Sequence, residues 1–301
     1  MKNKIYSFFK AYKSKKKLNA IRQSAEVITK DRIIHDLIKI GVRKGDLLFL
    51  HSSLARIGYV DGGADTVASA IMETIGPEGT LIVPTYSMKE SMYKTCMDNH
   101  FIFDVRKDTR GLGAIPAAVL RTHDVRTSIH PTHCTSSVGK DALYITESHH
   151  MSESTFGKDS PWERWLRRDG KLLGLGISMG PVTFYHTLED LAPDQFPIPV
   201  RMKNVFPVKC INWQGDIITV PVRPLDPKFM RFRIDHKERE DLRTYFRKEF
   251  TQAGIVKQGL IGRASSWIAP AEAFYRHLNG LMKEGITIYA TATDLKRRPV
   301  E

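Results

Sequence analysis

The 301-residue sequence has few cysteines, no long apolar segment and no internal repeat. Its three cysteines, Cys96, Cys134 and Cys210, are widely spaced and form no CxxC pair, which argues against a disulfide framework and a zinc knuckle. No apolar run is long enough to cross a bilayer, and Lys10 interrupts the apolar stretch before it could form a signal-peptide core. These absences predict a cytoplasmic protein that is neither secreted nor integral to a membrane.

Acidic residues are scarce relative to basic ones, 33 against 46, and the formal net charge is +13. Such a charge favours anionic partners. The sequence contains no zinc-finger, KH or RRM motif, so we expect no nucleic-acid partner. Lysines and apolar residues at helical spacing are concentrated in residues 1–25, which we interpret as a basic amphipathic extension. Peripheral contact with an anionic membrane, packing on a partner subunit in a homodimer, and a solvated appendage are the alternatives for it.

Residues 26–301 alternate between helical and extended patterns, as expected of one layered α/β domain. Thr29 is predicted to cap a helix that ends at Gly41, and a second helix should follow a turn and cap at residues 61–65. A proline-punctuated stretch predicts an antiparallel hairpin with its turn at Gln214-Gly215. The predicted helices are 29–40, 66–75, 113–121, one from about Thr183 and 270–283, and the predicted strands are 46–50, 80–84, 125–128, 171–175, 205–212 and 216–222.

His186 is the strongest catalytic candidate, because residues 183–190 should open a helix. The positive end of a helix favours the neutral imidazole that a general base needs. Glu189 and Asp190 follow at three and four residues, on the same helix face, so either carboxylate could hold the ring tautomer. Taken alone, a single histidine is more often structural.

Three loops offer further polar groups. His51-Ser52-Ser53-Leu54 follows a buried strand, where ligands of open α/β sheets usually bind. The Gly62-Gly63 turn feeds a helix whose amides could accept a phosphate, although an acidic cap at Asp65 would oppose this. The run His130-Pro131-Thr132-His133-Cys134 has no third ligand at fixed spacing, so we predict no metal. Residues 135–139 either supply oxyanion donors or form only a loop.

A rival interpretation comes from Gly176-Ile177-Ser178-Met179-Gly180, which matches the G-x-S-x-G nucleophile elbow and follows a predicted strand. A serine hydrolase of α/β type would complete its triad with Asp235 and His277, which occur in the right order. No HGGG-type oxyanion loop is present. A non-catalytic membrane-surface or scaffold protein that uses residues 1–25 is the third alternative.

Taken in order, these segments resemble the aminoglycoside 3-N-acetyltransferase family, also called the antibiotic N-acetyltransferase family. The resemblance runs almost collinearly from about Thr29 to Ala292. Its parts are Gly45-Asp46, His51-Ser52-Ser53-Leu54, Gly58, Gly62-Gly63-Ala64-Asp65, Gly76-Pro77-Glu78-Gly79-Thr80-Leu81, Pro84-Thr85-Tyr86-Ser87, Arg126-Thr127-Ser128-Ile129-His130-Pro131, Phe156-Gly157, Ser160-Pro161, Leu173-Gly174-Leu175-Gly176, Thr183, His186 and Glu189.

The resemblance implies an α/β/α sandwich. Together with the hairpin inferred above, the expected fold is a three-layer α/β/α sandwich with a mixed central sheet and a C-terminal antiparallel hairpin. The resemblance also implies that residues 26–301 bind acetyl-CoA or another acyl-CoA as co-substrate, with no metal, and use His186 as general base without an acyl-enzyme. Glu189 matches the acidic position of the family, and Thr183 its polar neighbour of the thioester. The implied coenzyme contacts are Ser52, Ser53, Leu54, Thr85, Ser87 and Ser137.

Two departures concern the acceptor. The segment from His130 to Ser136 stands where the family usually carries a serine-phenylalanine pair, and the chain is basic although aminoglycosides are polycations. The predicted reaction is transfer of an acetyl or a short, hydroxylated acyl group to the primary amine of an amino sugar by direct attack. The acceptor is either an aminoglycoside, which would give antibiotic resistance, or a dTDP- or UDP-linked amino sugar for surface polysaccharide.

Overall fold

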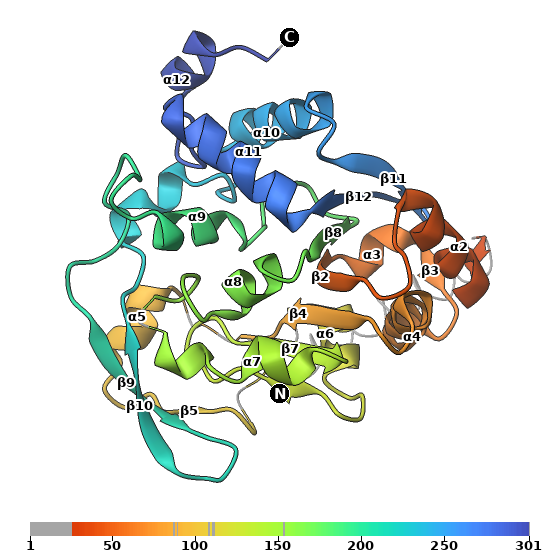
Figure 1. Ribbon diagram of the computed structural model, residues 1–301, viewed down its shortest axis with the longest axis horizontal. Helices are drawn as coiled ribbons and strands as arrows, with labels where there is room; N and C mark the ends of the chain where they lie inside the picture. The colour runs from red at the N-terminus through yellow and green to blue at the C-terminus, as the bar shows by residue number, and fades with distance from the viewer. Residues whose placement is uncertain are drawn as a thin grey trace, which may run out of the picture.

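The computed structural model describes residues 26–86, 88, 90–107, 109, 112–152 and 154–300. They form a mixed α/β structure around a seven-stranded sheet with the order β11-β12-β8-β2-β4-β7-β6 (Figure 1). The three central strands β8, β2 and β4 are parallel. On one side, β12 runs antiparallel to β8 and β11 to β12; on the other, β7 runs antiparallel to β4 and β6 to β7. The strands of this sheet are β2 Leu47–Ser52, β4 Thr80–Pro84, β6 Arg126–Thr127, β7 Thr135–Gly139, β8 Lys171–Leu175, β11 Lys257–Ile261 and β12 Ala264–Pro270.

Two smaller sheets accompany the main one. Strands β1 (Val27–Ile28) and β3 (Tyr59–Val60) pair in parallel. Strands β9 (Phe206–Ile211) and β10 (Ile217–Val222) form the predicted antiparallel hairpin, which extends away from the main sheet and pairs with β5 (Phe103–Asp104) (Figure 1). The antiparallel hairpin nearest the C-terminus is instead β11–β12, at one edge of the main sheet. The sequence did not reveal it, because exposed and buried residues do not alternate along β11.

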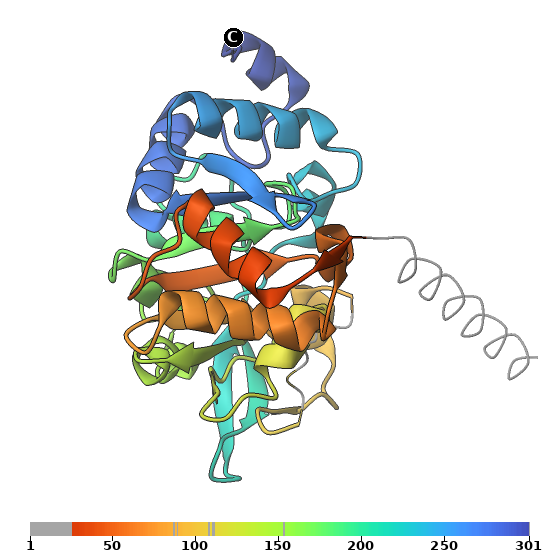
Figure 2. The ribbon, with the colours of Figure 1, turned by 90° about the vertical axis from the view of Figure 1, so that its right-hand side faces the viewer.

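Helices cover both faces of the main sheet, and the side chains of β2 show why. Leu47 and Phe49 belong to one hydrophobic cluster, and Leu48 and Leu50 belong to the other. Figure 2 shows α2 and α4 next to one another across one face. The helices are α2 Lys30–Ile40, α3 Leu54–Ile57, α4 Gly63–Ile75, α5 Met92–Met97, α6 Ala114–Val119, α7 Ala142–Thr146, α8 Pro161–Leu166, α9 Tyr185–Leu191, α10 Glu240–Gln252, α11 Ala271–Lys283 and α12 Ala292–Arg297, with 3-10 helices at His149–Met151 and Pro227–Phe232.

The ends of two helices test the predicted caps. Thr29 caps α2, since its hydroxyl accepts from the backbone N–H of Arg32 at 3.3 Å, and the helix ends at Gly41 as predicted. Helix α4 starts at Gly63, three residues earlier than predicted, after Gly62 in the left-handed conformation at φ 73°. The prediction that Asp65 is a cap was wrong: Asp65 lies inside the first turn and forms an exposed ion pair with Arg121.

Gly174 allows close contact between β8 and β12. It pairs with Trp267, and a Cβ atom built on Gly174 would lie 2.1 Å from the indole. The same indole donates its Nε1–H to the carbonyl oxygen of Ile177 at 3.1 Å. Trp267 therefore fixes the loop that leaves β8.

The predicted extension, residues 1–25, falls outside the described residues. Within the described part of the chain, no helix has the length and apolar character needed to cross a membrane.

Candidate active site

A cavity of about 290 Å³ opens where the central strands of the main sheet end. The carboxyl ends of β2, β4 and β8 lie there together with the start of β7, because Pro84 at the end of β4 pairs with Thr135. Loops that are distant in the sequence therefore converge there, as is usual for ligand sites of such sheets. We call it the histidine cavity; the residues that line it include His51, Ser52, Pro84, Tyr86, Glu90, His133, Thr183, His186, Arg233 and Asp235.

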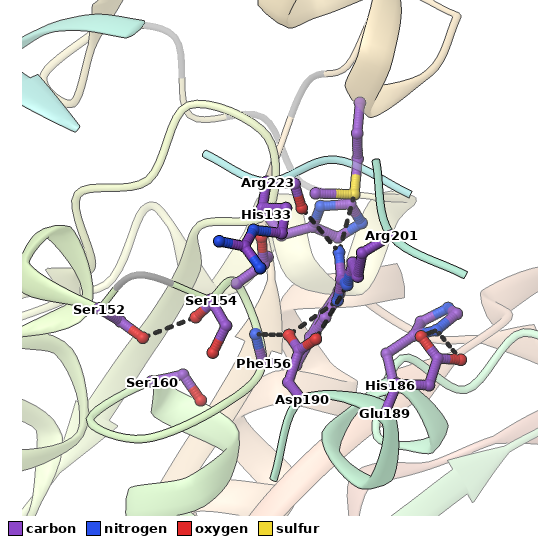
Figure 3. Close-up of polar contacts among 12 residues, drawn as sticks. His133, Ser152, Ser154, Phe156, Ser160, His186, Glu189, Asp190, Arg201 and Arg223 are labelled. Carbon is purple, nitrogen blue, oxygen red and sulfur yellow. Dashed lines mark hydrogen bonds and ion pairs between the residues drawn. The ribbon is translucent and has the colours of Figure 1, made fainter. Parts of the chain in front are cut away.

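His186 is the second residue of α9 and is held by a buried carboxylate (Figure 3). Its Nδ1 atom lies 2.9 and 3.0 Å from the two carboxylate oxygens of Glu189. The hydroxyl of Tyr289 donates to the same carboxylate at 2.9 Å. Because an ionised carboxylate only accepts hydrogen bonds, Nδ1 carries the hydrogen and Nε2 keeps its lone pair. The ring is thus in the tautomer suited to accept a proton at Nε2.

Glu189 is buried but remains acidic. Burial alone would raise its pKa, but the adjacent His186, the charge of Arg201 and the hydrogen bond from Tyr289 together hold the pKa of Glu189 below its usual value. The carboxylate is therefore ionised at neutral pH. An ionised partner stabilises the imidazolium that forms when His186 takes up a proton.

Asp190 has a different role from Glu189. Its carboxylate accepts from Nε and Nη2 of Arg201 at 2.8 and 2.7 Å and from the backbone N–H of Phe156 at 2.8 Å (Figure 3). Burial raises the pKa of Asp190, and the positive charge of Arg201 opposes that rise. The Phe156 ring lies 5.1 Å from the imidazole of His186, centroid to centroid. Asp190 thus anchors the segment that packs on the imidazole, and Glu189 contacts the imidazole itself.

Thr183 precedes α9, which begins at Tyr185 and therefore later than predicted. The Thr183 hydroxyl accepts from the indole Nε1–H of Trp162 at 3.0 Å and lies 3.4 Å from Nε2 of His51. Burial lowers the pKa of His51 to about 4, so this imidazole is neutral at physiological pH. With Trp162 as donor, the hydroxyl hydrogen of Thr183 is available to His51 or to an oxygen in the cavity.

The charged groups of the histidine cavity are largely paired. Asp235 accepts from Nε of Arg233 at 2.7 Å, and Glu90 forms an ion pair with Lys94. Burial lowers the pKa of His133 well below its usual value, so this ring stays neutral, and a positive charge on His186 after proton uptake would lower that pKa further. The cavity therefore presents little uncompensated negative charge.

A second cavity, of about 820 Å³, shares the lining residue Ser52 with the first. We call it the glycine cavity, since Gly58, Gly62, Gly63 and Gly113 are among its lining residues. Ser52, Ser53 and Leu54, three of the predicted coenzyme contacts, also line it. The Ser52 hydroxyl is buried and has no hydrogen-bond partner among the described residues.

The other predicted coenzyme contacts lie elsewhere. Thr85 is fully buried, and its hydroxyl lies 2.8 Å from that of Ser136, which lies 2.6 Å from the hydroxyl of Thr127. Ser137 is also fully buried, on β7. The alternative that residues 135–139 form only a loop was wrong, because they pair with β4 and β6 as strand β7. Ser87 lies outside the described residues.

The three residues of the rival hydrolase triad are not brought together. Ser178 lines a separate cavity, Nε2 of His277 contacts Glu249 at 3.1 Å, and Asp235 pairs with Arg233. The elbow motif requires a helix directly after the turn, whereas α9 starts only at Tyr185. In the described part of the chain, no group of three or more histidine, cysteine, aspartate or glutamate side chains is placed to hold a metal.

Three residues around His186 were not identified from the sequence: Tyr289, Arg201 and Trp162. Tyr289 lies 100 residues from its partner Glu189, and Trp162 lies 21 residues from Thr183. Side chains so far apart show no local spacing rule. The Phe156-Gly157 motif was the one sequence signal near them.

The mixed sheet thus carries a buried histidine–carboxylate pair in a cavity at the carboxyl ends of its central parallel strands, an arrangement typical of α/β enzymes. Comparison with known proteins is more specific. The sequence profile of the aminoglycoside 3-N-acetyltransferase family matches residues 49–283, and the chain belongs to this family.

Individual relatives agree with this assignment. Aminoglycoside N(3)-acetyltransferase III of Serratia marcescens is 30% identical over 257 residues, which cover 81% of this chain and 93% of the relative. The crystal structure of aminoglycoside acetyltransferase AAC(3)-Xa superposes with a TM-score of 0.72, covering 87% of this chain and 95% of the other. The two sequences are 26% identical. The structure of AAC-IIIb in a binary complex with CoASH, 22% identical, has a TM-score of 0.72 over 88% of this chain and 100% of the other, a likeness of fold.

Proposed function

We propose that residues 26–301 form an N-acyltransferase domain that moves an acyl group from acyl-CoA to the primary amine of an amino sugar. One observation carries the proposal. Nδ1 of His186 is fixed by the buried carboxylate of Glu189, while His186 lines a cavity that shares the lining residue Ser52 with a second cavity. A general base beside a two-armed site suits a reaction between two substrates that enter from different sides.

The glycine cavity suits the coenzyme. Its glycines have no side chains that would narrow it, and Ser52 is a residue that it shares with the histidine cavity. Ser52 would contact the pantetheine arm of the coenzyme. Ser53 and Leu54 would contact the same arm.

The chemical step is direct attack. Nε2 of His186 takes a proton from the acceptor amine as the amine nitrogen bonds to the thioester carbonyl carbon. The Thr183 hydroxyl, already an acceptor from Trp162, donates its hydrogen to the developing oxyanion. Collapse of the tetrahedral intermediate breaks the carbon–sulfur bond, and the proton held by His186 passes to the departing thiolate.

Two acceptor classes fit this chemistry. The curated relatives are named for aminoglycosides, which are polycations. In this chain, the two carboxylates of the histidine cavity are paired with Arg233 and Lys94, so the cavity presents little net negative charge to an acceptor. This observation favours a nucleotide-linked amino sugar, whose diphosphate is anionic, as the second candidate. The acyl group is acetyl or another short chain.

The test is a CoA-release assay with acetyl-CoA against a panel of aminoglycosides and of dTDP- and UDP-linked amino sugars. His186→Ala should lower kcat/KM by about 10²- to 10⁴-fold with the best acceptor. The matched control is His35→Ala, on the exposed surface of α2. A folded His186→Ala protein with parental turnover would refute the base assignment, and inactivation by His277→Gln with His186 dispensable would favour the serine hydrolase.

A further inference from the structure

A cavity of about 420 Å³ lies beside the histidine cavity and has no part in the chemical step above. Ile177 lines both cavities. The Trp267 indole, which also lines the second cavity, donates to the carbonyl oxygen of Ile177 and so holds this shared residue in place. We call this space the arginine cavity because four arginines line it: Arg56, Arg243, Arg247 and Arg263.

The four arginines come from three separate elements. Arg56 lies in α3, Arg263 lies in the turn between β11 and β12, and Arg243 and Arg247 lie in α10. The two α10 residues are four apart, so they share one helix face. The other polar lining residues are neutral, namely Ser178, Gln258, Ser265 and Ser266, and no described aspartate or glutamate lines the cavity.

Two of the four guanidinium groups have no carboxylate partner among the described residues, and a third has only a distant one. Arg243 is held by the carbonyl oxygens of Ile234 and His236 at 2.9 and 2.7 Å, as well as by Glu240. The guanidinium groups of Arg56 and Arg247 have no hydrogen bond or ion pair within the described part of the chain, and for Arg263 the nearest carboxylate oxygen, of Glu26, is 4.0 Å away. A concave site with several free guanidinium groups attracts anions, and guanidinium forks match phosphate oxygens best.

We propose that the arginine cavity binds phosphate groups of a substrate whose reactive end reaches the histidine cavity past Ile177. The inference rests on the proposed function and specifies it further, because it requires a phosphorylated substrate. Two substrates carry this chemistry: the coenzyme, with its diphosphate and 3′-phosphate, and a nucleotide-linked amino sugar, with its diphosphate. If the nucleotide-linked amino sugar occupies the arginine cavity, the pantetheine arm keeps the glycine cavity. If the coenzyme phosphates occupy it instead, the pantetheine arm reaches His186 past Ile177 and the glycine cavity is left to the acceptor.

Isothermal titration calorimetry on the full chain tests the proposal with four probes: CoA, dephospho-CoA, UDP and inorganic pyrophosphate. The variants are Arg56→Gln and Arg247→Gln, both at exposed positions, and the matched control is Arg276→Gln on the outer side of α11. Each cavity variant should weaken the binding of the cognate probe about tenfold, since one charge-assisted contact is lost. The control should bind as the parent does.

The pattern of losses identifies the source of the phosphate. Weaker CoA binding with unchanged UDP binding assigns the cavity to the coenzyme, and dephospho-CoA then shows whether the 3′-phosphate is the group held. Weaker UDP binding with unchanged CoA binding assigns the cavity to the acceptor. If both cavity variants bind all four probes as the parent does, or if the parent binds none, the proposal is overturned. Acyl transfer is measured separately, so weaker binding without any transferase activity would refute the proposed function and leave the phosphate site standing.

Discussion

Tyr289 donates a hydrogen bond of 2.9 Å to Glu189, the carboxylate that holds His186. The tyrosine belongs to the segment after α11, whereas the glutamate and the histidine share α9. The C-terminal third of the chain thereby completes a polar chain that begins in the middle of the sequence. Burial and the neighbouring carboxylate raise the pKa of Tyr289 well above its usual value, so its hydroxyl remains a donor at all physiological pH values.

Tyr289→Phe should impair catalysis without unfolding the protein. Losing this hydrogen bond raises the pKa of Glu189 and leaves the imidazole less firmly oriented. A hydrogen bond to a charged group is worth about 1.5 to 3 kcal/mol, so we expect kcat to fall about tenfold or somewhat more. The acidic limb of the kcat profile should also move to higher pH. Tyr275→Phe, at a half-buried tyrosine of α11, is the control, and an unchanged pH profile for Tyr289→Phe would contradict a positioning role.

Arg201→Met should destabilise the fold far more than loss of a surface ion pair. Arg201 neutralises Asp190 through two hydrogen bonds, and removing it leaves a buried carboxylate unpaired. Breaking such a pair costs about 3 to 5 kcal/mol. Arg121→Met, which breaks the exposed pair with Asp65, should cost about 0 to 1 kcal/mol. Urea denaturation measures the unfolding free energy of both variants. Equal losses would contradict the expectation that burial makes the Arg201–Asp190 pair costly to break.

Stability should decline with acidification from neutral pH. Burial lowers the pKa of His51 from 6.5 to about 4 and that of His149 from 6.5 to about 3. Between pH 6.5 and these values, the unfolded chain binds protons that the folded protein does not. The free energy of unfolding is therefore greatest above pH 6.5 and falls as the pH decreases, by about 1.4 kcal/mol per pH unit for each such histidine.

Urea titrations between pH 8 and pH 5 check this expectation. His149→Gln should reduce the slope of the unfolding free energy against pH by the contribution of about one proton. His35→Gln, at an exposed site on α2, should leave this slope unchanged. A free energy of unfolding that stays constant over this range would mean that the buried histidines carry compensating charges.

Gly174→Ala should weaken the sheet. The new methyl group would lie 2.1 Å from the Trp267 indole, which cannot move without releasing its hydrogen bond to Ile177. Overpacking of this kind costs about 1 to 3 kcal/mol. Gly280→Ala in α11 is the matched control, because a Cβ atom added there would have no atom within 4 Å and alanine favours the helix, so it should be neutral or slightly stabilising. Thermal unfolding of both variants decides, and a fully stable Gly174→Ala protein would contradict the packing argument.

Local rules predicted much of the fold. The caps at Thr29 and Gly41, strand β4 and the β9–β10 hairpin follow from neighbouring residues alone. The start of α4 was misplaced because Gly62 can adopt a left-handed conformation that other residues avoid, so the chain turns earlier. Residues 135–139 contain no hydrophobic alternation. Their place in β7 depends on pairing with β4 and β6, which only the folded sheet supplies, and on the contacts of the Ser136 hydroxyl with Thr85 and Thr127.

The site was predictable to the same extent. The contact between His186 and Glu189 follows from their spacing on one helix, which is why the sequence could suggest it. The spacing to Asp190 was equally good, and the choice between the two carboxylates depends on Arg201 and Phe156, which lie outside α9. The arginine cavity could not be predicted from the sequence, because its four arginines come from α3, α10 and the β11–β12 turn, which are far apart along the chain.

The position of Ser52 in the lining of both cavities has a consequence for substrate choice. Acyl group and amine would have to share the roughly 290 Å³ around His186, since the glycine cavity would be filled by the pantetheine arm. Each carbon added to the acyl chain would take space from the sugar. An enzyme built this way tunes donor length and acceptor size against one another, and a substitution that enlarges the pocket should relax both preferences together.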